Sequence, residues 1–340
     1  MSSPQRRVIV FPSITEGNPY QINFYKPLED AGWKVRNWSL FRLVLSTELL
    51  HVHWPEAWAW ADRWERLGRL LFIGLLPILK RAFGFRVLNT VHNLKPHSGF
   101  SRVGRWAYDR TLNTCDVFIH LSEAGKRLFL ENRPELSVRE HVVIPHPDYR
   151  PQLSDMSRSD ARSKLELREE GKRFVFFGRV RPNKGVERLI NSFREYDDMN
   201  ASLWIGGKCA PDVERDIRES IVGDRRIEFT PGFIDEADME AQVKAADWVV
   251  MPYSSGLNSG AVIYALSCGV RVLVPDSEVL RELHRLGGCT HMHFFEQHSF
   301  AHKFKEIVAL PICENLKEFN LDALHGDDIK SKVLSFFVKL

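Results

Sequence analysis

The chain has 340 residues, 44% of them hydrophobic, and a formal net charge of only +3 at neutral pH. This length fits two domains better than one, and the apolar content is enough for two cores. Because the charge is small and no nucleic-acid-binding signature is present, we expect no nucleic acid partner. The 5 cysteines are scattered, without a Cys-x-x-Cys pair, and we interpret them as reduced residues of a cytoplasmic protein.

The first half of the chain alternates short apolar runs with segments of helical periodicity. Pro19 suits the first position of a helix, and Gly32 suits the residue after its end. Strands that alternate with helices predict a parallel sheet of Rossmann type. The expected strands are 8–11, 33–38, 49–54, 87–91, 115–121 and 142–144.

Histidines stand on or after the third and fourth of these strands. His51 and His53 share a face of the third strand, but no third ligand with suitable spacing follows, so we expect no metal site there. His92 stands at the expected end of the fourth strand, at the edge where open α/β sheets bind ligands. A histidine there can exchange a proton or hydrogen-bond a ligand hydroxyl. Position alone favours a functional and a structural role for His92 equally.

The segment 54–85 is rich in tryptophan, arginine and leucine. It contains Trp54, Trp58, Trp60 and Trp64. Its apolar run is interrupted by Pro77 and is shorter than the roughly 20 residues that span a bilayer, and the start of the chain lacks the apolar region of a signal peptide. Tryptophan and arginine beside an apolar patch suit a membrane surface, while a helix packed on the sheet is the alternative. We expect peripheral membrane contact through Trp58 and Trp60.

Three prolines between residues 144 and 151 predict a hinge. We therefore divide the chain into a first domain over 1–150 and a second over 151–320. A final helix over 321–340 is expected to return to the first domain. A polar helix over 154–167 is expected directly after the hinge.

The second domain begins with a strand, a turn and a helix over 174–190. The turn holds two glycines, and Arg179, Arg181 and Lys184. A helix start after a strand directs backbone N–H groups at one point, where an anion is stable, and arginine can hold a phosphate with two parallel hydrogen bonds. A solvated basic loop is the alternative. We favour a phosphate site, with Gly178 and Arg181 as further contacts.

A second such arrangement follows the strand that ends at Tyr253. Asn258 or Ser259 can cap the next helix, and the small residues Ser259 and Gly260 allow a ligand close to its start. Free N–H groups and the helix dipole then provide a second place for an anion. A simple capped helix is the alternative. Tyr253 is expected among the contacts of the same ligand.

The turn Gly178-Arg179 with Lys184-Gly185 resembles the donor-diphosphate loop of GT-B glycosyltransferases of the family-4 type. The resemblance implies two Rossmann-like domains whose parallel sheets face each other across a cleft. It also implies that Arg179 and Lys184 hold the diphosphate of a nucleotide sugar, with Asn258, Ser259 and Gly260 at the second position. It reaches to about residue 300. Two glutamates usual in the family, near Gly256 and Tyr264, are absent, so ribose recognition and a retaining mechanism are not implied.

Motifs in the first domain resemble a bacterial exopolysaccharide subgroup that includes the β-mannosyltransferase of xanthan assembly. The shared positions are Asn18, Tyr20, His53, Glu56, His92 and His97. The resemblance places His92 near the reacting sugar and assigns no individual role to the others, of which we expect Asn18, Tyr20, His53 and His97 on the acceptor side. Ser98 stands where the subgroup usually has glutamate. Glu56 therefore remains as the nearest motif carboxylate and, with His92, is a candidate catalytic residue.

The sequence thus predicts a metal-independent hexosyltransferase without a cofactor, because no Asp-x-Asp pair is present. The subgroup implies a GDP- or UDP-sugar donor, with GDP-mannose favoured, and a lipid-linked saccharide acceptor. It also implies work in exopolysaccharide synthesis at the inner face of the cell membrane. A nucleotide-sugar epimerase or hydrolase of the same fold, or a non-catalytic nucleotide-sugar-binding protein, are the alternatives.

Overall fold

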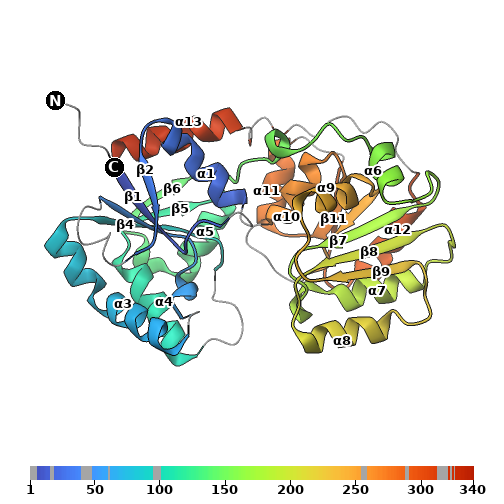
Figure 1. Cartoon of the computed structure of the whole chain (residues 1–340), viewed down its shortest axis with the longest axis horizontal. Coiled ribbons are helices and arrows are strands. Elements are labelled where there is room, and N and C mark those ends of the chain that lie inside the picture. The colour runs from blue at the N-terminus through green and yellow to red at the C-terminus, as the bar shows by residue number, and fades with distance from the viewer. Residues whose placement is uncertain are drawn as a thin grey trace. The chain divides into compact units, whose positions relative to one another are not determined.

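The protein was analysed as a computed structural model that describes residues 6–15, 19–39, 48–59, 62–94, 101–253, 259–287, 291–311, 321, 324 and 326–340. Two compact units make up the chain, and each contains a six-stranded parallel sheet with helices around it (Figure 1). The first unit holds Met1–Pro147 and Leu324–Leu340, and the second holds Asp148–Ala323. The α/β class expected from the sequence is confirmed.

The sheet of the first unit has the order β2-β1-β3-β4-β5-β6. Its strands are β1 (Arg7–Phe11), β2 (Lys34–Asn37), β3 (Leu49–Val52), β4 (Arg86–Thr90), β5 (Val117–His120) and β6 (Glu140–Val143). These are the six strands expected from the sequence, and three of them (β2, β3 and β5) are shorter by two or three residues. From β1 the chain passes to β2 at one edge of the sheet, and from β3 it passes to β4 towards the other edge. The carboxyl ends of β1 and β3 therefore form the switch point where such sheets bind ligands.

Helices surround this first sheet and include the last helix of the chain. They are α1 (Pro19–Asp30), η1 (Pro55–Ala59), α3 (Arg63–Phe83), α4 (Arg102–Thr114), α5 (Glu123–Asn132), η2 (Pro134–Leu136) and α13 (Gly326–Lys339). α13 lies beside α1 (Figure 1), and Val333 and Phe337 are fully buried in the same core cluster as Phe24 and Leu28 of α1. The apolar face of α13 thus belongs to the core of the first unit.

The sheet of the second unit has the order β12-β11-β10-β7-β8-β9. Its strands are β7 (Arg173–Phe177), β8 (Ser202–Gly207), β9 (Ile227–Pro231), β10 (Trp248–Val250), β11 (Arg271–Pro275) and β12 (Met292–Phe295). Numbered within the unit, this is the order 3-2-1-4-5-6 of the Rossmann fold, reversed here from edge to edge. The switch point therefore lies between β7 and β10.

The described part of the second unit contains nine helical segments around its sheet. They are η3 (Arg150–Gln152), α6 (Arg158–Lys164), η4 (Pro182–Lys184), α7 (Val186–Arg194), α8 (Pro211–Ser220), α9 (Glu236–Lys244), α10 (Gly260–Ser267), α11 (Glu278–Gly287) and α12 (Phe300–Ala309). α6 is shorter than the helix expected over 154–167. Ser157 and Asp160 form a capping box that fixes its start, and Glu166 ends it in the left-handed region, with φ 55°.

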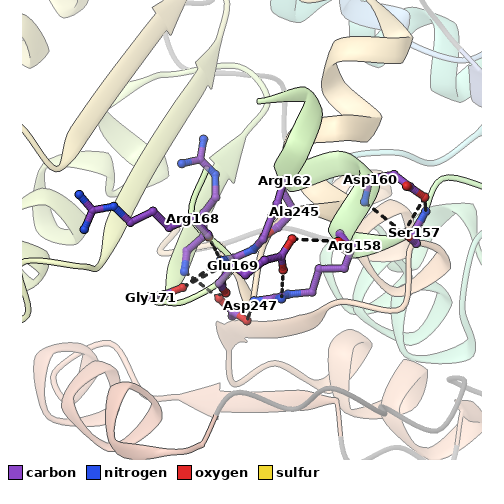
Figure 2. Close-up of polar contacts among 11 residues, drawn as sticks. Ser157, Arg158, Asp160, Arg162, Arg168, Glu169, Gly171, Ala245 and Asp247 are labelled. Carbon is purple, nitrogen blue, oxygen red and sulfur yellow. Dashed lines mark hydrogen bonds and ion pairs between the residues drawn. The ribbon is translucent and has the colours of Figure 1, made fainter. Parts of the chain in front are cut away.

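A buried arginine joins α6 to the sheet of the second unit (Figure 2). The Arg162 guanidinium donates to the Asp247 carboxylate at 2.9 Å. It also donates to the backbone carbonyl oxygens of Arg168, Glu169, Gly171 and Ala245. Asp247 in turn accepts the backbone N–H of Arg173, the first residue of β7, at 2.8 Å. Because buried charges are stable only when paired and hydrogen-bonded, this clamp fixes how α6 meets the sheet.

Candidate functional site

The two loops predicted to hold a phosphate lie on either side of the switch point of the second sheet. The loop after β7 contains η4, and the loop after β10 leads to α10. The two loops touch, because a Cβ added to Gly185 would lie 2.0 Å from the carbonyl oxygen of Pro252. Gly185 also has φ +68°, a conformation that other residues rarely adopt. Glycine is therefore required for the close approach of these loops.

Three cations occupy the loop after β7 without a carboxylate partner among the described residues. Arg179 is exposed, while Arg181 and Lys184 are half-buried. Burial, and then the neighbouring Arg181, lower the pKa of Lys184 from its ordinary value. Burial, and then Arg179, do the same for Arg181. A cluster of like charges without a counterion favours an anionic ligand, which would remove this repulsion.

Tyr253 links the two loops at this point. The Lys184 ammonium lies 4.4 Å from the centroid of the Tyr253 ring. The Tyr253 hydroxyl donates to Ser259 Oγ at 2.6 Å, and Ser259 Oγ in turn accepts the backbone N–H of Val262, which caps α10. The structure thus brings Lys184, Tyr253, Ser259 and Gly260 together at the start of α10. Asn258 lies outside the described residues.

The polar residues of the first unit gather at the carboxyl ends of β3 and β4. His92 stacks on Trp54 with ring centroids 4.4 Å apart, and meets the edge of Tyr20 at 5.0 Å. Its Nε2 lies 3.1 Å from His53 Nδ1. Glu56 is buried in η1 and accepts a hydrogen bond from Asn93 at 3.3 Å, and burial raises its pKa. Tyr20, His53, Glu56 and His92 are thus neighbours, whereas Asn18 and His97 lie outside the described residues.

A buried hydrogen-bonded chain extends from His92 into the sheet. The Tyr25 hydroxyl lies 2.7 Å from His53 Nε2 and 2.6 Å from His51 Nδ1, and His51 Nε2 lies 2.8 Å from Thr90 Oγ1. Sequence reasoning missed Tyr25 and Thr90. Tyr25 is on the apolar face of α1, where it reads as a core residue, and Thr90 reads as an ordinary strand residue. Only the packing of α1 on the sheet shows that Tyr25 connects the two histidines, and only the pairing of β3 with β4 brings Thr90 to His51.

Burial keeps these histidines neutral at physiological pH. It lowers the pKa of His51 to about 3 and that of His53 well below its ordinary value. The pKa of His92 is lowered to about 3 by burial, and then by His146 and His51. Among the described residues, no group of three or more histidine, cysteine, aspartate or glutamate side chains is arranged to hold a metal ion.

We expect the first unit to lose stability in mild acid. Burial lowers the pKa of His51 and His120 to about 3 and that of His146 to about 4, whereas in the unfolded chain each titrates near 6.5. Below pH 6.5 the unfolded chain therefore binds more protons, and stability falls as pH decreases towards 4. At pH 5 each of the three groups costs ~2 kcal/mol.

Urea unfolding followed by tryptophan fluorescence at pH 7.5 and pH 5 tests this expectation. Trp204 and Trp248 are the only tryptophans after residue 147, so the signal mainly reports the first unit. A midpoint that is the same at both pH values would contradict it.

One sequence expectation is wrong. Trp58 does not face a membrane, because η1 turns it beneath the sheet, where it is fully buried and stacks on Phe11 with ring centroids 3.4 Å apart. Trp60 lies outside the described residues. Trp54 is half-buried against His92. Of these four tryptophans only Trp64, on α3, is shown to be strongly exposed.

Comparison with known proteins places this arrangement in context. Residues 171–309 match the family model for glycosyl transferases group 1. The GDP-mannose:glycolipid 4-beta-D-mannosyltransferase of Xanthomonas campestris pv. campestris is 29% identical over 266 residues, which cover 77% of this chain and 70% of that protein. The D-inositol 3-phosphate glycosyltransferase of Jonesia denitrificans is 28% identical over 148 residues, 40% of this chain and 35% of that protein.

Solved structures share the fold over nearly the whole chain. Sucrose-phosphate synthase from Thermosynechococcus elongatus superposes with a TM-score of 0.72 at 17% identity, over 99% of this chain and 100% of that one. HepE from Anabaena, in complex with UDP and glucose, gives a TM-score of 0.72 at 16% identity, with the same coverage. At these identities the likeness establishes the fold, which is that of the GT-B glycosyltransferases.

Proposed function

We propose that this chain is a GT-B glycosyltransferase that transfers mannose from GDP-mannose to a lipid-linked saccharide, in keeping with the match of its residues 171–309 to the model for glycosyl transferases group 1. The observation that carries the proposal is the group of three cations at the switch point of the second sheet, which have no carboxylate partner among the described residues. The Xanthomonas relative is named for GDP-mannose and a glycolipid, which supports this choice of donor and acceptor. Exopolysaccharide synthesis at the inner membrane face is the corresponding proposed setting.

In the proposed reaction the second unit binds the donor. An acceptor hydroxyl oxygen bonds to the anomeric carbon while the bond from that carbon to the diphosphate oxygen breaks, and its electron pair leaves with the diphosphate. Arg179, Arg181, Lys184 and the start of α10 at Ser259 supply positive charge where negative charge grows. Gly178, Gly260 and Tyr253 shape the loops around it. These groups supply the charge that a metal ion would otherwise provide.

The first unit is proposed to bind the acceptor beside His92. Tyr20 packs against the His92 ring, and both Tyr20 and His53 are buried behind it. Asn18 and His97 remain proposed acceptor contacts on the basis of the resemblance. Glu56 is buried, which makes His92 the better placed of the two candidate catalytic residues for direct contact with a sugar.

Turnover of labelled nucleotide sugars tests the proposal. Purified protein is incubated with GDP-mannose or UDP-glucose, each with and without a lipid extract that contains diphosphate-linked saccharides. We expect GDP release and a labelled lipid product only when GDP-mannose and the extract are both present. An isomerised nucleotide sugar would instead indicate an epimerase, release without lipid a hydrolase, and binding without turnover a non-catalytic protein.

The proposed membrane contact lies on α3 rather than on η1. Five large apolar side chains at helical spacing are exposed along this 21-residue helix, namely Trp64, Leu67, Leu71, Leu75 and Ile78. Exposed arginines lie nearby on the same helix (Arg81) and on the adjacent α4 (Arg102 and Arg105), whereas Arg66 points away from this α3 face. No helix of the described residues is long and apolar enough to cross a membrane. An apolar stripe with basic residues nearby matches an anionic lipid surface.

We expect Leu71→Glu/Leu75→Glu to release the protein from anionic vesicles. Both leucines are exposed, so folding is preserved, while burying two leucines in lipid contributes about 3 kcal/mol, or roughly a hundredfold in partitioning. Vesicle flotation measures the bound fraction, and thermal unfolding confirms the fold. Met199→Glu/Val222→Glu, which replaces two exposed apolar residues of the second unit, is the matched control. Equal flotation of both variants would contradict contact through α3.

A further inference from the structure

The geometry of the hydrogen-bonded chain behind His92 determines which ring nitrogen of His92 carries the hydrogen. It joins Thr90, His51, Tyr25, His53 and His92 through four contacts of 2.6 to 3.1 Å. We call these five residues the histidine relay. Thr90, His51, Tyr25 and His53 are almost fully buried, while His92 is half-buried. Each contact needs one hydrogen between its two heavy atoms.

The relay has one hydrogen more than its contacts need. Each neutral imidazole carries one N–H, and Tyr25 and Thr90 carry one O–H each, which gives five hydrogens for four contacts. The burial that lowers the pKa of all three histidines keeps them neutral, so no sixth hydrogen enters. One hydrogen must therefore remain outside the chain of contacts.

Three arrangements place this spare hydrogen. It can belong to Thr90 if every bond points from His92 towards Thr90, or to Tyr25 if both neighbouring histidines donate to the tyrosine oxygen. It can belong to His92 if every bond points from Thr90 towards His92. An imidazole within the relay cannot hold the spare hydrogen, since both of its nitrogens are already in contacts.

Burial distinguishes the three arrangements. Neither the Thr90 nor the Tyr25 hydroxyl has a further hydrogen-bond acceptor among the described residues, so a spare hydrogen there would be buried and unpaired, at a cost of roughly 1–3 kcal/mol. His92 Nδ1 is different. It takes no part in the relay, and the His92 side chain is half-buried rather than fully buried, so a hydrogen on Nδ1 is not confined to the core.

We infer that the histidine relay fixes His92 as the tautomer with hydrogen on Nδ1, so that His92 presents an N–H donor at the end of β4. In this form Nε2 accepts from His53, and Nδ1 donates to an oxygen of a bound ligand. Taking the proposed function as given, that oxygen belongs to a saccharide, and His92 orients it rather than removing its proton. Tyr25, His51, His53 and Thr90 are positioning residues, since they act on the ligand only through His92.

Nitrogen NMR of the full chain labelled with 15N-histidine tests the inference at pH 7.5. The signals of His92 are identified by their loss in His92→Gln. We expect a protonated shift for Nδ1 and an unprotonated shift for Nε2. Tyr25→Phe removes the hydroxyl that links the hydrogen bonds of His51 to those of His53, so the direction of the bonds is no longer fixed at His92. Both His92 shifts should then move towards the average of the two tautomers.

Two comparisons separate this effect from general damage. Tyr108→Phe removes another buried hydroxyl of the first unit, outside the relay, and should leave the His92 shifts unchanged. Thr90→Val should mix the tautomers, whereas Thr90→Ser, which keeps the donor, should restore the wild-type shifts. A protonated Nε2 in the wild type, or His92 shifts that are the same in Tyr25→Phe as in the wild type, would overturn the inference. Glycosyl transfer is measured separately, so its absence would count against the proposed function and leave the tautomer result standing.

Discussion

We expect Lys184→Met to lower kcat/KM for the proposed donor, GDP-mannose, by roughly 10²–10³-fold, the usual loss when a charged group that stabilises a leaving group is removed. The ammonium lies at the switch point of the second sheet, beside Tyr253 and without a carboxylate partner among the described residues. Methionine keeps most of the side chain over the Tyr253 ring, so the loss reports charge rather than packing. Single-turnover rates at saturating donor show whether the loss lies in kcat.

A matched control for this variant is Lys305→Ala. Lys305 is an exposed lysine of α12 in the same unit, and its ion pair with Glu195, at 2.9 Å, is of the surface kind that contributes little. We expect turnover within about twofold of the wild type for a surface change of this kind. Similar losses in both variants would mean that loss of a lysine lowers activity by destabilising the fold. Near-normal turnover of Lys184→Met would contradict a role of this loop in binding the diphosphate.

We expect Arg162→Met to destabilise the second unit by about 3–5 kcal/mol, the usual cost of removing one partner of a buried ion pair. Asp247 would keep its charge in the core, and four backbone carbonyl oxygens would lose their donor (Figure 2). Such a loss is a large part of the stability of an ordinary domain. Urea unfolding at pH 7.5, followed by circular dichroism, measures it.

Arg158 offers the matched control for the clamp. It pairs with the other oxygen of Asp247 at 2.9 Å, but its side chain is 28% exposed. Arg158→Met should therefore cost on the order of 1 kcal/mol. The double variant Arg162→Met/Asp247→Asn removes both buried charges and should be less destabilised than the sum of its single variants. Equal effects of Arg158→Met and Arg162→Met would contradict a special role for the buried arginine.

Much of the fold could be predicted because it depends on local patterns. Apolar runs gave the six strands of the first sheet, and the strand, glycine turn and helix around Arg179 and Lys184 marked the loop after β7. The same logic offered Asn258 or Ser259 as the cap of the next helix, and Ser259 is the cap of α10. These features are set by neighbours in the sequence, so sequence reasoning can reach them.

Other features depend on contacts between distant segments. Tyr25 meets His51 and His53 only because α1 packs on the sheet. Nothing near Tyr25 in the sequence indicates that its hydroxyl belongs to a hydrogen-bonded network. The segment around Trp58 has the tryptophan and arginine content of a membrane interface, whereas η1 turns the Trp58 side chain into the core. The clamp of Arg162 joins residues 85 apart in the chain, and no periodicity signals it.

The central claim is that the loops after β7 and β10 bind a diphosphate, and calorimetric titration with GDP and GMP tests it most directly. The two ligands differ by one phosphate group, which is the group that Arg179, Arg181 and Lys184 are proposed to hold. We predict that GDP binds at least tenfold more tightly than GMP, a difference of about 1.4 kcal/mol. Equal affinities for the two nucleotides, or no binding of either, would contradict the account.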